Sequence, residues 1–113
     1  MDNHDWMIKF PGSITVSDAD GIIIDMNEKA ADSFIGDGGF NLKGKNLFEC
    51  HPEPSRSQLK GMFKNQELNV YTIEKKGIKK LIYQTPWYQE GKFAGFIELS
   101  LEIPWDMPHF ISD

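Results

Sequence analysis

The sequence lacks the features that mark secreted, membrane-spanning or nucleic-acid-binding proteins. Its single cysteine, Cys50, allows no internal disulfide. It has no apolar run long enough to span a membrane, and its acidic N-terminus has no apolar signal core, so we expect a cytoplasmic protein. Its net charge is −5, and its lysines form one small cluster, between Lys75 and Lys80, which we expect at a solvated hairpin tip. Because there is no broad basic stripe, we expect no nucleic-acid partner.

Catalytic motifs are missing as well. The sequence has no nucleophile elbow, no phosphate-binding P-loop and no HExxH metal motif. Its three histidines are far apart in the chain and have no spacing typical of metal ligands. Glu98 and Glu102 form a carboxylate pair, but they fall on the polar face of a predicted strand, where we expect them to be solvated. We therefore predict a binding module and not an enzyme.

The most informative segment runs from residue 12 to residue 34. Its apolar residues predict strands over residues 14–17 and 22–25, and Asp20-Gly21 predicts a tight turn between them. Asp and Gly suit such a turn because both tolerate a positive φ. Asn27 follows the second strand and precedes the residues EKAADSF, so we expect it to cap a short helix that ends near residue 34.

Two further helical segments are expected in the middle of the chain. Residues 42–49 indicate a short helical turn, which His51-Pro52 ends. Ser55 is then expected to cap a helix over residues 56–65. This helix has one apolar face, made of residues at positions i, i+3 and i+4: Leu59, Met62 and Phe63.

Alternating residues in the last part of the chain predict three strands, over residues 68–74, 79–88 and 93–103, with turns at Gly77 and at Glu90-Gly91. In the last strand the odd-numbered residues from 97 to 103 are apolar and the even-numbered ones are polar, which is typical of a half-buried strand. The element order predicts an α+β fold, a five-stranded antiparallel sheet with short helices packed on one face.

Residues 13–103 resemble a PAS domain. The family's opening pattern falls on five positions of this chain: Asp18, Gly21, Asn27, Ala31 and Phe34. The residues GKNLF at 44–48 resemble a conserved turn of the family, and residues 85–98 resemble its closing hairpin. The resemblance divides the chain into a leader (residues 1–12), a PAS domain (residues 13–103) and a Pro-rich tail (residues 104–113).

This resemblance implies a sensory or interaction module of signal transduction. Such domains bind a small molecule or cofactor between the helices and the sheet, or pair with another PAS domain. The candidates for lining the cavity are Phe34, Leu47, Cys50, His51, Leu59, Met62, Phe63, Tyr71, Tyr83, Gln84, Thr85 and Trp87. The alternative for each aromatic residue is an ordinary place in the core. Structural roles are expected for Asp20, Gly21 and Asn27.

Cys50-His51-Pro52 raises the question of a cofactor. Haem-binding PAS domains use a His from this helical region, so one alternative function is a haem-based gas or redox sensor with His51 as the axial ligand. In the other reading, Cys50 is a small buried apolar residue and His51 ends a helix. A photoreactive flavin adduct is excluded by the resemblance, because Leu47 stands where the reactive Cys would be. Cys50 also lies too close to Asn46 to match the chromophore-bearing Cys of photoactive yellow protein.

Both ends of the chain carry large apolar residues. Trp6, Ile8 and Phe10 alternate in the leader, and the tail contains Trp105, Met107 and Phe110. Because such side chains are costly to leave in water, we expect them to pack on the domain or on a second subunit, and so predict a homodimer.

No kinase, cyclase or helix-turn-helix sequence follows the domain, so we expect a free-standing module that acts in trans on a signalling protein. A second alternative is a protein–protein adaptor whose own side chains fill the cavity.

Overall fold

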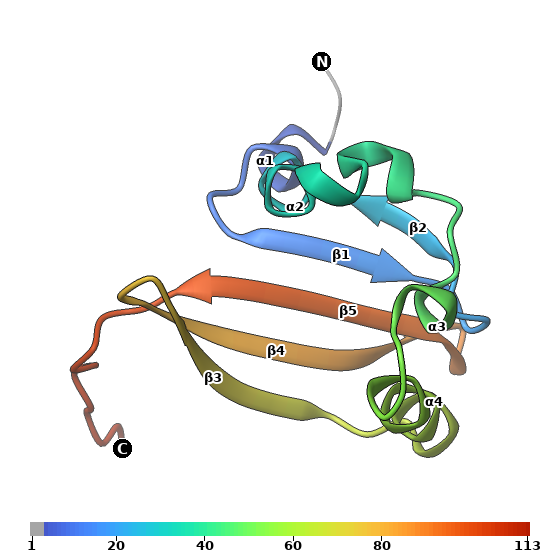
Figure 1. Ribbon diagram of the computed structural model, residues 1–113. Helices are drawn as coiled ribbons and strands as arrows, with labels where there is room; N and C mark the ends of the chain where they lie inside the picture. The colour runs from blue at the N-terminus through green and yellow to red at the C-terminus, as the bar shows by residue number, and fades with distance from the viewer. Residues whose placement is uncertain (1–3) are drawn as a thin grey trace.

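The computed structural model describes residues 4–113. Residues 1–3 of the predicted leader lie outside this range. The described chain forms one antiparallel sheet in the order β2-β1-β5-β4-β3, with short helices on one face (Figure 1). The strands are β1 (Ser13–Ser17), β2 (Ile23–Met26), β3 (Asn69–Lys75), β4 (Ile78–Gln89) and β5 (Lys92–Glu102). The predicted fold class is confirmed.

The helices are short, as the sequence predicted. They are α1 (Asp5–Ile8), α2 (Glu28–Ser33), α3 (Leu47–Cys50), α4 (Ser55–Asn65) and two 3₁₀ helices, η1 (Ile35–Asp37) and η2 (Gly39–Leu42). In Figure 1, α1 and α2 lie beside β1 and β2, whereas α3 and α4 lie toward the other end of the sheet, at the lower right of the view. No helix within residues 4–113 is long and apolar enough to cross a membrane.

Asn27 is fully buried and caps α2, at the position that the sequence predicted. Its Oδ1 accepts hydrogen bonds from the backbone N–H groups of Ala30 and Ile14, both at 3.0 Å. Its Nδ2 donates to the carbonyl oxygens of Gly12 (2.8 Å) and Met7 (3.1 Å). One side chain therefore joins the leader, β1 and α2.

The turn between β1 and β2 is held by Asp18, and the expected role of Asp20 is wrong. The Asp18 Oδ1 accepts hydrogen bonds from the N–H groups of Asp20 and Ile22, both at 2.9 Å. Gly21 has the positive φ that the turn requires, +83°. Asp20 is not among the described non-glycine residues with positive φ. The carboxylate two residues earlier closes the turn, so Asp20 needs no special backbone conformation.

The predicted cap of α4 is also wrong. Pro54 occupies the N-cap position, and no side chain bonds to the first turn from there. Instead, the Glu53 carboxylate accepts hydrogen bonds from the Ser57 N–H and the Ser57 hydroxyl, both at 2.8 Å. These bonds lower the pKa of Glu53.

The leader is part of the folded unit. Trp6 and Ile8 lie in the short helix α1. Lys9 forms a salt bridge of 2.8 Å with Glu28 at the start of α2. The side chains of Phe10 and Leu101 both lie close to Gly12, so Phe10 packs next to β5 of the sheet. Trp6 remains exposed.

The tail after β5 has no regular structure and leaves the sheet at the β3–β4 turn (Figure 1). The Trp105 Nε1 donates to the carbonyl oxygen of Gly77 at 3.2 Å, and the Lys79 Nζ lies 5.9 Å from the Trp105 ring centroid. Met107 and Phe110 remain exposed. Trp105 therefore contacts the β3–β4 turn, although its side chain is also exposed.

Candidate functional site

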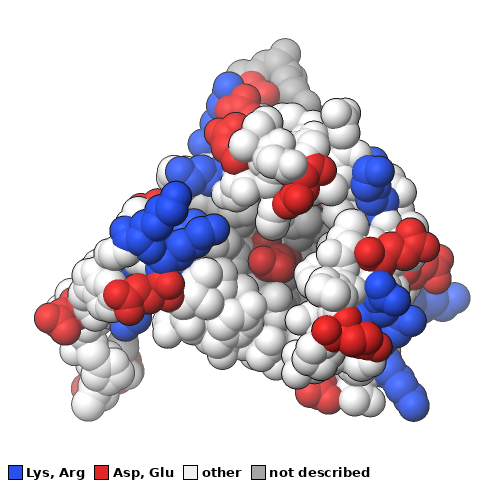
Figure 2. Space-filling view, in the orientation of Figure 1, with Lys and Arg blue, Asp and Glu red and all other residues white. Residues whose placement is uncertain are grey.

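A cavity of about 490 Å³ lies between the helices and the sheet. Figure 2 shows a hollow near the middle of this face, with an acidic group inside it. The cavity is lined by residues of β1, β2, β5 and the helical segments: Thr15, Ile23, Met26, Phe34, Asp37, Leu42, Lys45, Leu47, Cys50, His51 and Glu98. Its walls are mostly apolar, and its sheet side carries Thr15 and Glu98.

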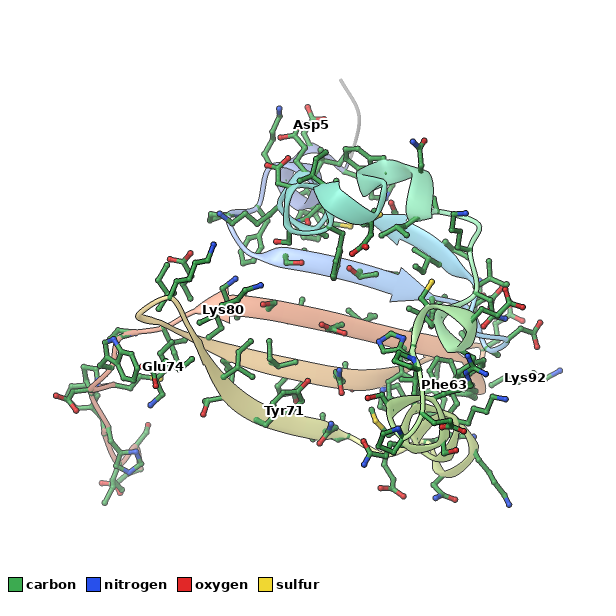
Figure 3. The ribbon with its side chains drawn as sticks, in the orientation of Figure 1. Asp5, Phe63, Tyr71, Glu74, Lys80 and Lys92 are labelled. Carbon is green, nitrogen blue, oxygen red and sulfur yellow. The ribbon has the colours of Figure 1, made fainter. Side chains whose placement is uncertain are left out.

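A smaller cavity of about 40 Å³ lies under α4. It shares Thr15, Leu47 and Glu98 with the larger one, and its other lining residues are Ser17, Leu59, Met62, Phe63, Gln84 and Phe96. The ring of Phe63 packs against Phe48, Phe93 and Phe96, with centroids 4.6–6.0 Å apart. Figure 3 shows Phe63 at α4. This aromatic cluster holds α4 against the sheet and closes one end of the site.

Four polar side chains form a row across the sheet side of the site. The strand register places Thr15 opposite Glu98, and Glu98 opposite Gln84. It also places Asn69 opposite Gln84. Residues that pair in this way share one face of the sheet. The Asn69 Nδ2 donates to the Gln84 Oε1 at 2.9 Å, and the Gln84 Nε2 donates to the Glu98 Oε2 at 3.3 Å.

Glu98 is the titratable group at the centre of this row. Burial raises the pKa of Glu98, although the hydrogen bond from Gln84 and the nearby charge of His51 act in the opposite direction. Burial and the charge of Glu98 also raise the pKa of Tyr71, which lies in the middle of β3 (Figure 3). A carboxyl that is buried beside a cavity is a common feature of functional sites.

His51 lies across the cavity from the sheet. Its Nδ1 is 2.8 Å from the carbonyl oxygen of Leu47, and a carbonyl can only accept, so Nδ1 carries the proton. The Nε2 of the neutral ring is then an acceptor. The Arg56 Nε donates to the His51 backbone oxygen at 3.0 Å, which fixes the end of α3.

The structure brings together most of the predicted cavity residues. Phe34, Cys50 and His51 line the larger cavity, and Leu47 lines both. The smaller cavity contains Leu59, Met62, Phe63 and Gln84. Tyr71 pairs with Ile82 in the register and shares the helix-facing side of the sheet, but it lines neither cavity and is 42% exposed.

Tyr83, Thr85 and Trp87 lie on the other face of the sheet, so their expected place in the cavity is wrong. Side chains of a strand alternate between its faces, and Gln84 faces the helices. The Trp87 Nε1 instead donates to the backbone oxygen of Ser17 at 3.0 Å.

Cys50 is exposed, which corrects the expectation of a small buried residue. Within residues 4–113, no group of His, Cys, Asp and Glu side chains could hold a metal ion.

Glu98 lines both cavities, although the sequence pattern predicts a solvated side chain there and does not indicate a site residue. The apolar residues Ile97, Leu99 and Leu101 of β5 lie on the outer face of the sheet, so Glu98 between them faces the helices. The sequence signal for Glu98 is the large aromatic Phe96, two positions earlier on the same face of β5, which the structure buries. Thr15 and Asn69 had no distinguishing signal, because their places depend on the strand register.

No protein-family model matches the sequence, and no curated protein matches it. Solved structures do match. A sensory box sensor histidine kinase from Vibrio cholerae aligns over 87% of this chain and 86% of its own, with a TM-score of 0.64 and 19% identity. The PAS domain of an HTR-like protein from Haloarcula marismortui aligns over 87% of this chain and 86% of its own, with a TM-score of 0.60 and 17% identity.

The chain has the PAS fold. A third PAS structure is the Aer2 receptor from Vibrio cholerae, described as a dual PAS-haem oxygen sensor. It aligns over 82% of this chain and 95% of its own, with a TM-score of 0.59 and 17% identity. At these identities the likeness concerns the fold, and one fold hosts many functions.

Proposed function

We propose that this PAS domain is a sensory module that binds a small molecule in the larger cavity. The structural change on binding would be passed to a signalling partner in the cytoplasm, and the domain would catalyse no reaction. The observation that supports the proposal is the cavity itself, about 490 Å³ in volume, with apolar walls and a few convergent polar groups. This combination is typical of small-molecule sites. A cavity of this size disfavours the alternative of an adaptor whose own side chains fill it.

The cavity is placed to affect the sheet. Thr15 and Glu98 line it from the two neighbouring strands β1 and β5, and Gln84 and Asn69 continue their row to the far edge of the sheet. A ligand that displaces Glu98 would change the hydrogen bonds of this row. The sheet would thereby carry the signal from the cavity to its outer face.

We further propose that the outer face of the sheet pairs with a second copy of the chain. This face carries the half-buried apolar residues Ile97, Leu99 and Leu101. Phe10 extends the apolar surface beside Leu101. A twofold pairing would cover the same surface on both copies.

Native mass spectrometry of the purified protein tests ligand binding. We expect a retained small molecule in the wild type and its loss in Leu47→Trp, because the larger side chain would fill both cavities. Leu68→Trp is the matched control, since Leu68 is exposed and lines neither cavity. If added or retained molecules bind Leu47→Trp as well as the wild type, the cavity is not the binding site.

Haem binding by His51 is a second candidate. The observation that favours it is the orientation of the ring, in which the Nδ1–H bonds to the Leu47 carbonyl and the Nε2 is left as a possible iron ligand. The mostly apolar walls of the cavity suit a porphyrin. The polar carboxyl group of Glu98 is the part of the lining that does not. His51 would be the protein ligand, and the iron would supply gas or redox chemistry.

Absorbance after reconstitution with haem tests this candidate. A strong band near about 400 nm in the wild type that is lost in His51→Ala would support it. His109→Ala is the control, because His109 lies in the exposed tail. If the wild type shows no such band after reconstitution, haem is ruled out as the cofactor.

A further inference from the structure

The polar row across the sheet has a direction. Asn69 donates to Gln84, and Gln84 in turn donates to the Glu98 Oε2. The row therefore ends at Glu98 as an acceptor. Among residues 4–113, no hydrogen bond joins a protein group to the Glu98 Oε1, and Glu98 lines both cavities. One carboxylate oxygen is thus left to accept a hydrogen bond from a molecule in the cavity.

A second acceptor lies on the helical side. The His51 Nδ1–H is used by the Leu47 carbonyl, so the Nε2 of the neutral ring can only accept. His51 and Glu98 line the same cavity. A head group that carries several N–H donors would satisfy both.

No lysine or arginine within residues 4–113 forms a salt bridge with Glu98. Lys45 and Asp37 line its rim, and both are exposed to solvent. Lys43 is turned toward Asp25, with its Nζ 3.8 Å from the carboxylate. A negatively charged ligand would bring a second anion toward Glu98, which is unfavourable in a partly desolvated site. A ligand without donors would leave the Glu98 charge uncompensated.

We propose that the cavity binds a cationic nitrogen compound, an amine or amidine on an apolar or aromatic body, with its head group at Glu98 and its body against Ile23, Met26 and Leu47. This inference rests on the proposed function, because it requires that the cavity binds a ligand. In this proposal the polar row selects the charge of the ligand.

Titration of ¹⁵N-labelled protein with three compounds that share one ring tests the proposal. The probes are benzamidine, benzyl alcohol and benzoate, and NMR reports which backbone amides shift. We expect benzamidine to shift the amides of Thr15, Leu47 and Glu98, and to bind at least about tenfold more tightly than benzyl alcohol. Benzoate is expected to bind most weakly.

Two variants show whether Glu98 causes the preference for benzamidine over the other two compounds. Glu98→Gln keeps the side-chain shape but removes the charge, and we expect it to weaken benzamidine binding by about tenfold or more. Glu102→Gln is the matched control, because it removes the same charge from the same strand at an exposed position. It is expected to leave benzamidine binding unchanged.

The outcomes separate this inference from the proposed function. If benzyl alcohol or benzoate shifts the cavity amides at lower concentration than benzamidine does, the inference of a cationic head group is wrong. The proposal that the cavity binds a small molecule would still be supported. If benzamidine shifts only amides outside the cavity, or binds Glu98→Gln as tightly as the wild type, the inference is wrong. If none of the probes shifts a cavity amide, the inference also fails, and the native mass spectrum alone then decides whether the cavity holds a ligand.

Discussion

The ring of Phe48 occupies the space where a Cβ atom of Gly21 would lie. The Phe48 Cε2 is 2.6 Å from that position, which is closer than two non-bonded carbon atoms can approach. Gly21 also has a φ of +83°, in the region that side chains disfavour. The turn between β1 and β2 and the helix α3 are thus packed together at a residue without a side chain.

Gly21→Ala should lower the free energy of unfolding by about 1–3 kcal/mol, because the methyl group meets the Phe48 ring and the positive φ becomes strained. Urea denaturation measures the change. Gly61→Ala is the control, since Gly61 lies in α4 with nothing within 4 Å of its Cβ position. Gly61→Ala should raise the free energy of unfolding by about 0.5–1 kcal/mol. Equal effects at both positions would contradict the packing of Phe48 on Gly21.

Asn27→Ala should cost more than an ordinary helix cap. Loss of a cap alone costs about 1 kcal/mol. Here the substitution also leaves the Ile14 N–H and the Gly12 carbonyl oxygen without their partner in a buried place. We therefore expect a loss of about 2–4 kcal/mol in the free energy of unfolding, measured by urea denaturation.

Asn46→Ala is the matched control for Asn27→Ala. Asn46 caps α3 by accepting a hydrogen bond from the Phe48 N–H at 2.8 Å, but it is only half-buried. Its loss should cost about 1 kcal/mol. If both variants lose the same amount, the bonds of Asn27 to the leader and to β1 add nothing to stability.

Glu98 should make stability depend on pH. Burial raises its pKa above the ordinary value of 4.5 in the folded protein. Between the ordinary and the raised pKa the native state binds more protons than the unfolded state, so the contribution of Glu98 to stability falls as pH rises. Above the raised pKa its buried charge is fully destabilising. Glu98→Gln should therefore be more stable than the wild type at about pH 7, and the difference should close as pH falls toward 4.5.

Urea midpoints of wild type and Glu98→Gln between about pH 4 and pH 8 measure this effect. Glu102→Gln controls for the change in net charge. A Glu98→Gln variant that is less stable than the wild type at neutral pH would show that the carboxylate contributes more through its bond to Gln84 than its burial costs.

Leu99→Glu should weaken the proposed homodimer, because it places a charge in the middle of the outer apolar face. Sedimentation velocity at concentrations on the order of tens of micromolar measures the association. Ile35→Glu adds the same charge to an exposed apolar site on the helical layer, and should leave association unchanged. A wild type that sediments as a monomer at these concentrations would overturn the dimer.

Local patterns determined much of this protein. Asn27 caps α2 because the cap depends on residues two or three positions away. The turns at Gly77 and at Glu90-Gly91 form where the sequence between alternating strands predicted them, and the structure adds a positive φ at Lys76 and Glu90. The order of strands and helices followed from the same local signals, and with it the fold class.

Tertiary structure decided which face of the sheet the helices cover. Alternation with period two divides the residues of β4 and β5 into two sets, but it does not say which set is covered, because both faces of this sheet carry apolar residues. Ile82 and Phe96 pack under the helices, and the same face then takes Gln84 and Glu98 into the site. Tyr83 and Leu99 are turned outward. The burial of Glu98 depends on the packing of α4 on the sheet through Phe63, a contact between residues far apart in the chain that no local pattern encodes.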